Sequence, residues 1–281
     1  MTAISDIRPS PIAGRWYEGD PKRLAGEVDS YLNNASLPEF KGEVVAVVAP
    51  HAGHIYSGRT AGFAFRSVLG KSFPLVVIFS PLHSFHFEPL LVSAHQAYAT
   101  PLGAIPIDEA AVAALEQQLE KAGGPNLARI AYDQEHSLEI ELPFLQRALK
   151  GEFKLLPVML RSQEPEVSRQ LGLAAAEVLR GKSCLLVAST DLSHFYDEKK
   201  ANQFDTEMLR QFESFSPEGI YRAEQSGRGF ACGMAAVAAV FWAAKALGGT
   251  RVQVIHHSTS ADETGDRSSV VGYGAAVVLR E

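Results

Sequence analysis

The chain of 281 residues can bury a substantial core, and its hydrophobic share of 46% and charged share of 21% are ordinary for a globular protein. A net charge of −6 offers neither the basic surface that binds nucleic acid nor a polybasic segment for anionic lipid. Two cysteines, Cys184 and Cys232, form no disulfide framework, which indicates a reducing compartment. Residues 1–16 lack the apolar core of a signal peptide, and the longest apolar run, residues 234–244, is too short to cross a bilayer. We therefore expect a cytoplasmic protein that associates with neither nucleic acid nor membrane.

Predicted strands and helices alternate along the sequence. Short apolar runs rich in valine, isoleucine and leucine predict strands at residues 43–49, 75–80, 89–94, 153–159, 184–189, 251–257 and 270–279. Helices are expected at residues 21–33, 57–69, 108–121, 135–149, 164–180, 199–213, 217–225 and 231–247. Most of the strands are continuous apolar runs, which is typical of strands covered on both faces. The pattern therefore predicts an α/β fold, with a central, mostly parallel β-sheet flanked by helices.

No linker, charge block or internal repeat divides the chain, so we expect residues 1–281 to form a single domain. Residues 1–40 are expected to pack on this domain as an arm or cap. The reason is that Trp16 and Tyr17 would otherwise be exposed aromatic side chains.

Three loops that carry histidines each follow a predicted strand, at residues 50–54, 80–86 and 189–194. In an open parallel sheet, ligands gather beyond the carboxyl ends of the strands, so side chains from these loops can meet in one pocket. His51 and His83 follow their strands most closely and are the better candidates for metal ligation. For His51, a loop histidine that is hydrogen-bonded to backbone is the competing interpretation, and the evidence for His83 comes from its equivalent place at a second strand end.

Other residues near these loops carry two interpretations each. Cys232 is expected in the first turn of the most apolar predicted helix, where free backbone N–H groups favour its thiolate. It could be a nucleophile, a soft metal ligand or simply a small buried side chain. Asp191 and His194 could form an acid–base pair, although Asp191 could instead cap a helix, an interaction worth about 1 kcal/mol. His136 and Glu139 share a helical face, where they could form a carboxylate–imidazole hydrogen bond or merely place an acid near a helix N-terminus.

Three further features are interpreted as structural. Pro143 is expected to kink or bound the helix predicted at residues 135–149. Cys184 lies inside a strand run and is expected to pack there. The acidic loop at residues 262–266 lacks the full spacing of an EF-hand, which favours a polar turn.

Several segments recur in order along nearly the whole chain in one known family. They are AGRWY at 13–17, PHAGHIYSG at 50–58, TPLG at 100–103, EHSLE at 135–139 with LPFL at 142–145, STDLSH at 189–194, CG at 232–233, and TGD at 264–266 with VVGY at 270–273. Together these segments resemble the Memo family, known in bacteria and archaea as AmmeMemoRadiSam system protein B.

The resemblance implies a fold similar to that of class III extradiol dioxygenases, with a metal pocket at one edge of the central sheet. In that fold, two histidines and a glutamate hold non-haem iron, and in the Memo family a cysteine takes the third ligand position. Carried over by motif, the metal ligands would be His51, His83 and Cys232. The catalytic groups that line the same cavity would be Asp191, His194 and His136. The implied cofactor is one metal ion, with iron or copper expected before zinc.

The sequence departs from the family pattern at two positions. His54 stands where the pattern usually has a tyrosine, which adds a potential ligand or proton carrier and leaves the number of ligands open. Ser193 stands where the animal protein has a cysteine, and this change does not affect the implied ligands.

Three functions fit these residues. The favoured one is a metal-dependent oxidoreductase acting on an unknown small molecule, with His194 or His136 as the acid–base group and Asp191 orienting it. The second is a non-catalytic binding protein that supports a radical SAM or AMMECR-type partner, because the bacterial family name refers to those gene neighbours. The third is a hydrolase with Cys232 as its nucleophile.

Overall fold

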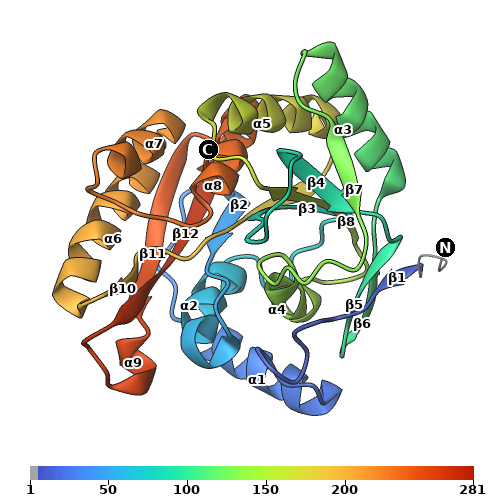
Figure 1. The fold of residues 1–281 in the computed structure, drawn as a ribbon. Coiled ribbons are helices and arrows are strands. Elements are labelled where there is room, and N and C mark those ends of the chain that lie inside the picture. The colour runs from blue at the N-terminus through green and yellow to red at the C-terminus, as the bar shows by residue number, and fades with distance from the viewer. Residues whose placement is uncertain (1–5) are drawn as a thin grey trace.

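The computed structural model describes residues 6–281 (Figure 1), and a large β-sheet forms its centre. The strands of this sheet are β2 (Glu43–Ala49), β3 (Leu75–Pro81), β4 (Leu90–Ser93), β7 (Leu127–Ile130), β8 (Lys154–Leu160), β9 (Cys184–Ser189), β10 (His194–Tyr196), β11 (Arg251–Thr259) and β12 (Val270–Arg280). Their order across the sheet is β10-β12-β2-β9-β3-β8-β4-β7, and β11 pairs with β12 outside this path.

The middle of the sheet is parallel and its flanks are mixed. Strands β2, β9, β3 and β8 run in one direction, so their carboxyl ends lie along one edge. Strand β12 is antiparallel to β2, β10 and β11, and β4 is antiparallel to β8. The α/β prediction is confirmed, and the sheet as a whole is mixed rather than mostly parallel. The antiparallel pairs involve the C-terminal strands β11 and β12, the predicted strand β4, and the short strand β10, which the apolar-run pattern does not detect.

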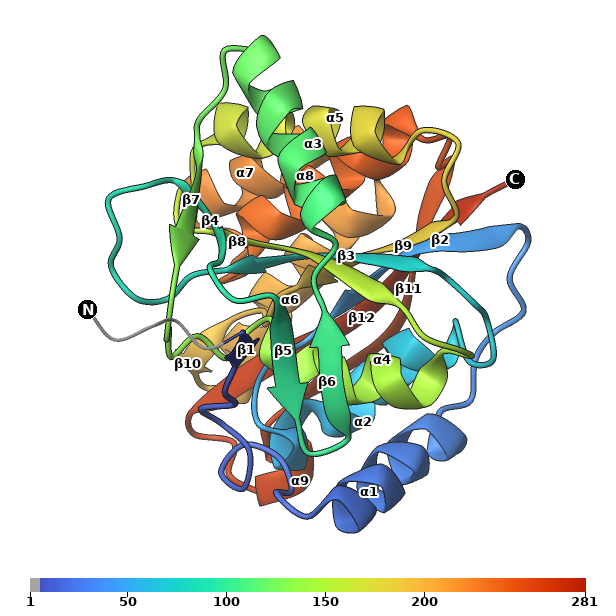
Figure 2. The ribbon, with the colours of Figure 1, turned by 90° about the vertical axis from the view of Figure 1, so that its right-hand side faces the viewer.

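A second, smaller sheet lies beside the large one (Figure 2). It contains β1 (Ile7–Arg8), β5 (Ala97–Thr100) and β6 (Gly103–Pro106), in the order β1-β5-β6. Strand β1 pairs with β5 in parallel and β6 pairs with β5 antiparallel. These three strands were not predicted, because each has four residues or fewer and no continuous apolar run.

Helices cover both faces of the large sheet (Figure 2). The helices of the described residues are α1 (Pro21–Asn34), α2 (His54–Arg66), α3 (Glu109–Lys121), α4 (Leu142–Ala148), α5 (Pro165–Leu179), α6 (Glu198–Glu213), α7 (Pro217–Gln225), α8 (Met234–Ala246) and α9 (Ala261–Thr264), with a 3₁₀ turn η1 (Glu139–Glu141). Helices α3, α5, α7 and α8 lie on one face, and α1, α2 and α4 lie on the other. Within residues 6–281, no helix combines the length and apolar character needed to cross a membrane.

Helix α1 illustrates how the sequence sets an element. Asp20 caps it by accepting a hydrogen bond from the backbone N–H of Arg23 at 2.9 Å, which satisfies one of the free donors at the helix start. Leu24, Val28 and Leu32 recur every four residues and are buried, so one apolar stripe faces the protein. This stripe is why the N-terminal segment packs as a helix against α2 and α4.

The helix predicted at residues 135–149 is shorter than expected. Residues 135–138 form a loop, η1 follows, and α4 begins only at Leu142. Pro143 lies in the first turn of α4, where a backbone N–H would have no helical partner, so its absence costs nothing. Of the two expected outcomes, a kink or a helix boundary, the proline marks the boundary. The loop leaves the backbone N–H groups before the helix available to other partners, which matters for the site below.

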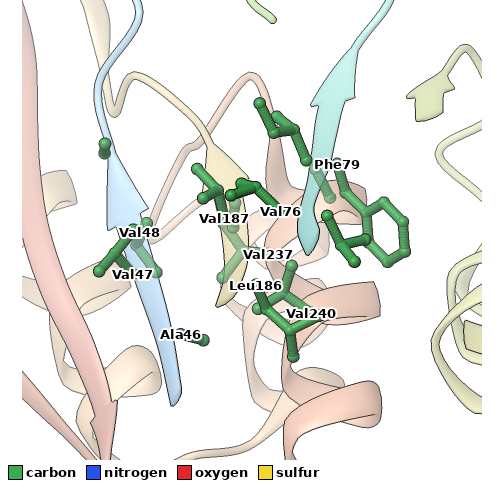
Figure 3. Close-up of a cluster of buried hydrophobic side chains, with 14 of the residues drawn as sticks. Ala46, Val47, Val48, Val76, Phe79, Leu186, Val187, Val237 and Val240 are labelled. Carbon is green, nitrogen blue, oxygen red and sulfur yellow. The ribbon is translucent and has the colours of Figure 1, made fainter. Parts of the chain in front are cut away.

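One buried cluster of apolar side chains extends from Ile12 to Leu279. Figure 3 shows its centre, where Val237 and Val240 of α8 pack against Val76 and Leu186 of the parallel strands. Each fully buried valine or leucine contributes about 1.5–3 kcal/mol relative to an exposed one. From the expected N-terminal arm, Ile12 and Tyr17 belong to the same cluster, while residues 1–5 lie outside the described residues.

Candidate metal centre

Three histidines converge at the edge where the parallel strands end. His51 follows β2, His83 follows β3, and His136 lies in the loop before η1. Each offers one ring nitrogen, and these nitrogens all lie within 4.8 Å of one another. A metal ion that binds imidazoles at about 2.0–2.1 Å would bring their nitrogens to roughly 3.4 Å apart, so only a small closure of the side chains is needed. Among residues 6–281, this is the cluster of histidine, cysteine or acidic side chains that could hold a metal ion.

His51 is buried and held in one tautomer by Ser189, the last residue of β9. The Ser189 hydroxyl donates its single proton to the carbonyl of Ser137 at 2.6 Å, so it can only accept from His51 Nδ1, which lies 2.8 Å away. His51 therefore carries its proton on Nδ1 and a lone pair on Nε2. Burial, assisted by the nearby charges of His136 and His83, lowers the pKa of His51 well below its usual value, so the ring is neutral.

His83 is oriented by Glu135. The carboxylate of Glu135 accepts from His83 Nδ1 at 2.9 Å and from the backbone N–H of His83 at 2.6 Å. Burial opposes ionisation of Glu135, but the hydrogen bonds and charge of His83 and further backbone N–H groups lower its pKa far below the usual range. The ionised carboxylate fixes the His83 proton on Nδ1, so Nε2 of His83 is free to bind a metal.

The His136 ring contacts two other rings. Its imidazole stacks on that of His83 with centroids 4.7 Å apart, and the Trp16 indole lies on it at 4.1 Å. Burial lowers the pKa of His136 to about 4 against the opposing charge of Glu135, so the ring is neutral near pH 7. His136 was expected in the cavity as a catalytic group, and the structure brings it among the potential ligands.

Glu139 does not serve as the carboxylate partner that the sequence pattern suggested for His136. Its side chain instead accepts hydrogen bonds from Arg8, Ser10 and Tyr17. The physical reason is that residues 135–138 are not helical, so positions 136 and 139 do not share a helix face.

Cys232 contacts the cluster from another direction. Its Sγ lies 3.2 Å from Nε2 of His51, and the backbone N–H of Asp191 donates to Sγ at 3.3 Å. The close approach depends on Gly233, where a Cβ would lie 2.2 Å from the carbonyl oxygen of Ser189. Cys232 therefore touches His51 but does not belong to the group of three mutually close ligand atoms.

The thiol of Cys232 lies before α8 rather than in the first turn of that helix, where it had been expected. Burial, assisted by the negative charge of Asp191, raises the pKa of the thiol far above its usual value. The expected stabilisation of a thiolate by helix N–H groups is therefore outweighed, and the metal-free group is a neutral thiol.

Asp191 and His194 lie in the third loop, which is extended rather than helical. Asp191 Oδ1 accepts the backbone N–H of His51 at 2.8 Å, so this residue caps no helix. Burial raises the pKa of Asp191 to about 7, although that hydrogen bond opposes the shift. His194 begins β10 and donates from Nδ1 to the carbonyl of Leu192 at 2.8 Å, which leaves a lone pair on its Nε2. Burial lowers the pKa of His194 below its usual value, which favours the neutral ring.

His54 lies apart from the cluster. Its ring is buried against Tyr17 and Phe144, with centroids at 5.4 and 4.9 Å, and its Nε2 lies 3.3 Å from the carbonyl of Ile140. The second cysteine of the chain, Cys184, is half-buried in β9 as expected. The structure thus assigns His54 to packing between α1, α2 and α4.

An open hollow of about 520 Å³ abuts the cluster. One lining residue is Trp16, whose ring lies 4.1 Å from that of His136. The lining also includes Ala52 and Gly53, which follow His51, and Phe195, which follows His194. The His83 side chain is 40% exposed, so the cluster itself is open to solutes. Two other hollows, of about 580 and 690 Å³, are lined by no histidine.

Fold and geometry together define an α/β protein with a histidine-rich pocket that could hold a metal ion. The model of the Memo-like protein family matches residues 8–277. The chain is 33% identical over 273 residues to a MEMO1 family protein of Aquifex aeolicus, covering 97% of this chain and 99% of the relative. It is also 30% identical over 273 residues to one from Nitrosopumilus maritimus, covering 96% and 98%. The chain therefore belongs to the Memo family, which confirms the resemblance seen in the sequence motifs.

Proposed function

We propose that this chain is a metal-dependent oxidoreductase whose metal is held at the cluster of His51, His83 and His136, with Cys232 as an additional ligand. The observation that carries the proposal is the convergence of three imidazole nitrogens within 4.8 Å at the edge where the parallel strands end. The relation to extradiol dioxygenases that the Memo family resemblance implies supports redox chemistry, as an argument by analogy.

The donor set fits a first-row transition metal. Ser189 and Glu135 direct protons to the far nitrogens of His51 and His83, so the near nitrogens carry lone pairs. Imidazoles suit iron, copper and zinc, and a thiolate shifts the preference towards copper(I) or zinc. When bound, an iron or copper ion would supply the electron transfer that no side chain of the cluster provides.

Acid–base work in this proposal falls to His194. Because its Nδ1 donates to Leu192, its Nε2 can accept a proton from a substrate in the pocket. Asp191 holds the loop that carries His51 by accepting the backbone N–H of that residue. The hollow beside Trp16 and Phe195 provides an apolar wall for a small organic substrate.

The test is oxygen consumption by the protein after anaerobic loading with iron(II) or copper(I), against a broad panel of phenolic substrates. We expect activity that falls by about 10²–10⁴-fold in His194→Ala, the usual contribution of a general acid or base. Metal-loaded protein that consumes no oxygen with any substrate would contradict the oxidoreductase proposal.

The distance between Cys232 Sγ and His51 Nε2, 3.2 Å, favours a second candidate, a thiol hydrolase with His51 as its base. Alkylation of Cys232 by iodoacetamide, unaffected by added metal, would support this candidate. Protection of the thiol by stoichiometric metal would support metal ligation. Stable co-purification of the metal-free chain with a radical SAM or AMMECR-type protein would instead favour the binding role.

A further inference from the structure

Arg8 is a buried cation that no motif singled out and that the proposed reaction does not use. Its side chain is 1% exposed. The guanidinium donates to both carboxylate oxygens of Asp133, at 3.0 and 2.6 Å, and to Glu139 at 2.6 Å. It also donates to the backbone carbonyl of Glu135 at 2.7 Å. The planar fork of arginine suits such a set of acceptors, and lysine could not satisfy all of them.

These contacts hold the segment 133–139, which carries two groups of the candidate metal centre. Asp133 Oδ1 accepts the backbone N–H of Glu135 at 3.1 Å, so Arg8 and Asp133 together fix both backbone groups of Glu135. The carboxylate of Glu135 then orients His83 and accepts the backbone N–H of His136 at 2.9 Å. A continuous path of hydrogen bonds thus joins Arg8 to His83 and His136.

The same N-terminal stretch reaches the centre a second time through Trp16 and Tyr17. The Trp16 indole lies on the His136 ring, and the Tyr17 hydroxyl donates to Glu139 at 2.8 Å. The backbone carbonyl of Trp16 also accepts the N–H of His54 at the start of α2. Residues 8–17 therefore clamp the segment 133–139 at both ends.

We propose that Arg8 is a positioning residue, which fixes Glu135 and His136 so that their side chains and that of His83 hold the arrangement needed for metal binding. The part of this inference that concerns metal affinity rests on the proposed function. The part that concerns the order of the segment 133–139 does not, and it can be measured in metal-free protein.

The test compares Arg8→Lys with Val112→Ala, a control in α3 that opens a cavity at a fully buried side chain without touching the network. Two readouts are needed: hydrogen exchange of a peptide spanning residues 133–139 in metal-free protein, and Zn²⁺ affinity by competition with a chromogenic chelator. For Arg8→Lys we expect faster exchange confined to that peptide and Zn²⁺ affinity lower by about 10–100-fold, as is usual when an outer partner of a ligand is lost. For Val112→Ala we expect unchanged Zn²⁺ affinity.

Equal exchange and equal affinity in the two variants would overturn the proposal. Asp133→Asn is the second variant, because it leaves Arg8 and Glu139 as a balanced charge pair. Its amide oxygen can still accept the backbone N–H of Glu135, while its amide nitrogen replaces the acceptor that faces Nε of Arg8. It should show the same local effect to a smaller degree. A wild-type chain that binds no Zn²⁺ would count against the metal site alone, and the exchange data would then decide the role of Arg8.

Discussion

Glu135 is the residue whose replacement tests the geometry of the cluster most sharply. Its carboxylate accepts four N–H bonds: from His83 N at 2.6 Å, and from His83 Nδ1, His136 N and Ser137 N at 2.9 Å each. Three of these bonds reach Oε1 and one reaches Oε2. In Glu135→Gln the amide oxygen can keep the Oε1 position, but the amide nitrogen then faces the backbone N–H of His83 as a second donor.

The expected loss of stability follows from the contact between two hydrogen-bond donors and from the loss of the carboxylate charge. A hydrogen bond to a charged group contributes about 1.5–3 kcal/mol, so the free energy of unfolding should fall by about this amount. Metal affinity should fall by about 10–100-fold, which corresponds to about 1.4–2.8 kcal/mol. The second loss arises because the proton on His83 Nδ1 is no longer fixed by an anion, and Nε2 then spends time protonated.

Urea unfolding gives the stability change, and titration with Zn²⁺ in a competition assay gives the affinity. Glu120→Gln, an exposed position in α3, is the matched control that removes one carboxylate far from the network. Glu135→Gln that binds Zn²⁺ as tightly as the wild type, while the control behaves normally, would show that Glu135 does not orient a metal ligand.

Three further predictions concern other parts of the molecule. Cys232→Ser should keep Zn²⁺ binding by the three histidines but lower copper(I) affinity more strongly, since a hydroxyl is a poor ligand for soft metals; equal losses for both metals would contradict this ligand assignment. In Trp242→Phe, Trp16 is the remaining tryptophan, and its fluorescence should be quenched by stoichiometric Cu²⁺ because its ring lies 4.1 Å from that of His136; unquenched emission at saturating Cu²⁺ would place the ion elsewhere. Burial raises the pKa of Glu224 to about 7. Between about pH 4.5 and 7 the folded state therefore binds more protons than the unfolded state, so the free energy of unfolding falls as pH rises through that window. Glu224→Gln should therefore be more stable than the wild type at pH 8 and closer to it at pH 5, as measured by urea unfolding, whereas a difference that does not vary with pH would exclude ionisation of Glu224 as its cause.

The central strands could be predicted because burial on both faces demands continuous apolar runs, as in 184–189 and 270–279 of the sequence. The short strands β1, β5 and β6 could not, since their pairing depends on partners far away in the chain. The loop at residues 135–138 was taken for helix because its local pattern suits one. In the structure, hydrogen bonds from this loop to the side chain of Glu135 replace the helical ladder.

Some residues of the candidate site could likewise be predicted from the sequence, and others could not. His51 and His83 could be predicted as cluster members because each directly follows a parallel strand, and topology brings those ends together. Arg8 and Glu135 could not, because their roles depend on hydrogen bonds across more than 50 residues of sequence, between Arg8 and Asp133 and between Glu135 and His83. An acid beside a histidine in the EHS segment was the one local signal for Glu135. The unusual feature of Arg8, its complete burial, is visible only in three dimensions.

The most direct test of the proposed metal centre is metal content by inductively coupled plasma mass spectrometry on protein purified without chelator. Wild type should be compared with His51→Ala and His136→Ala. We predict near-stoichiometric iron, copper or zinc in the wild type, lost in His51→Ala and strongly reduced in His136→Ala. Wild-type protein that holds no metal, even after anaerobic reconstitution, would contradict the account.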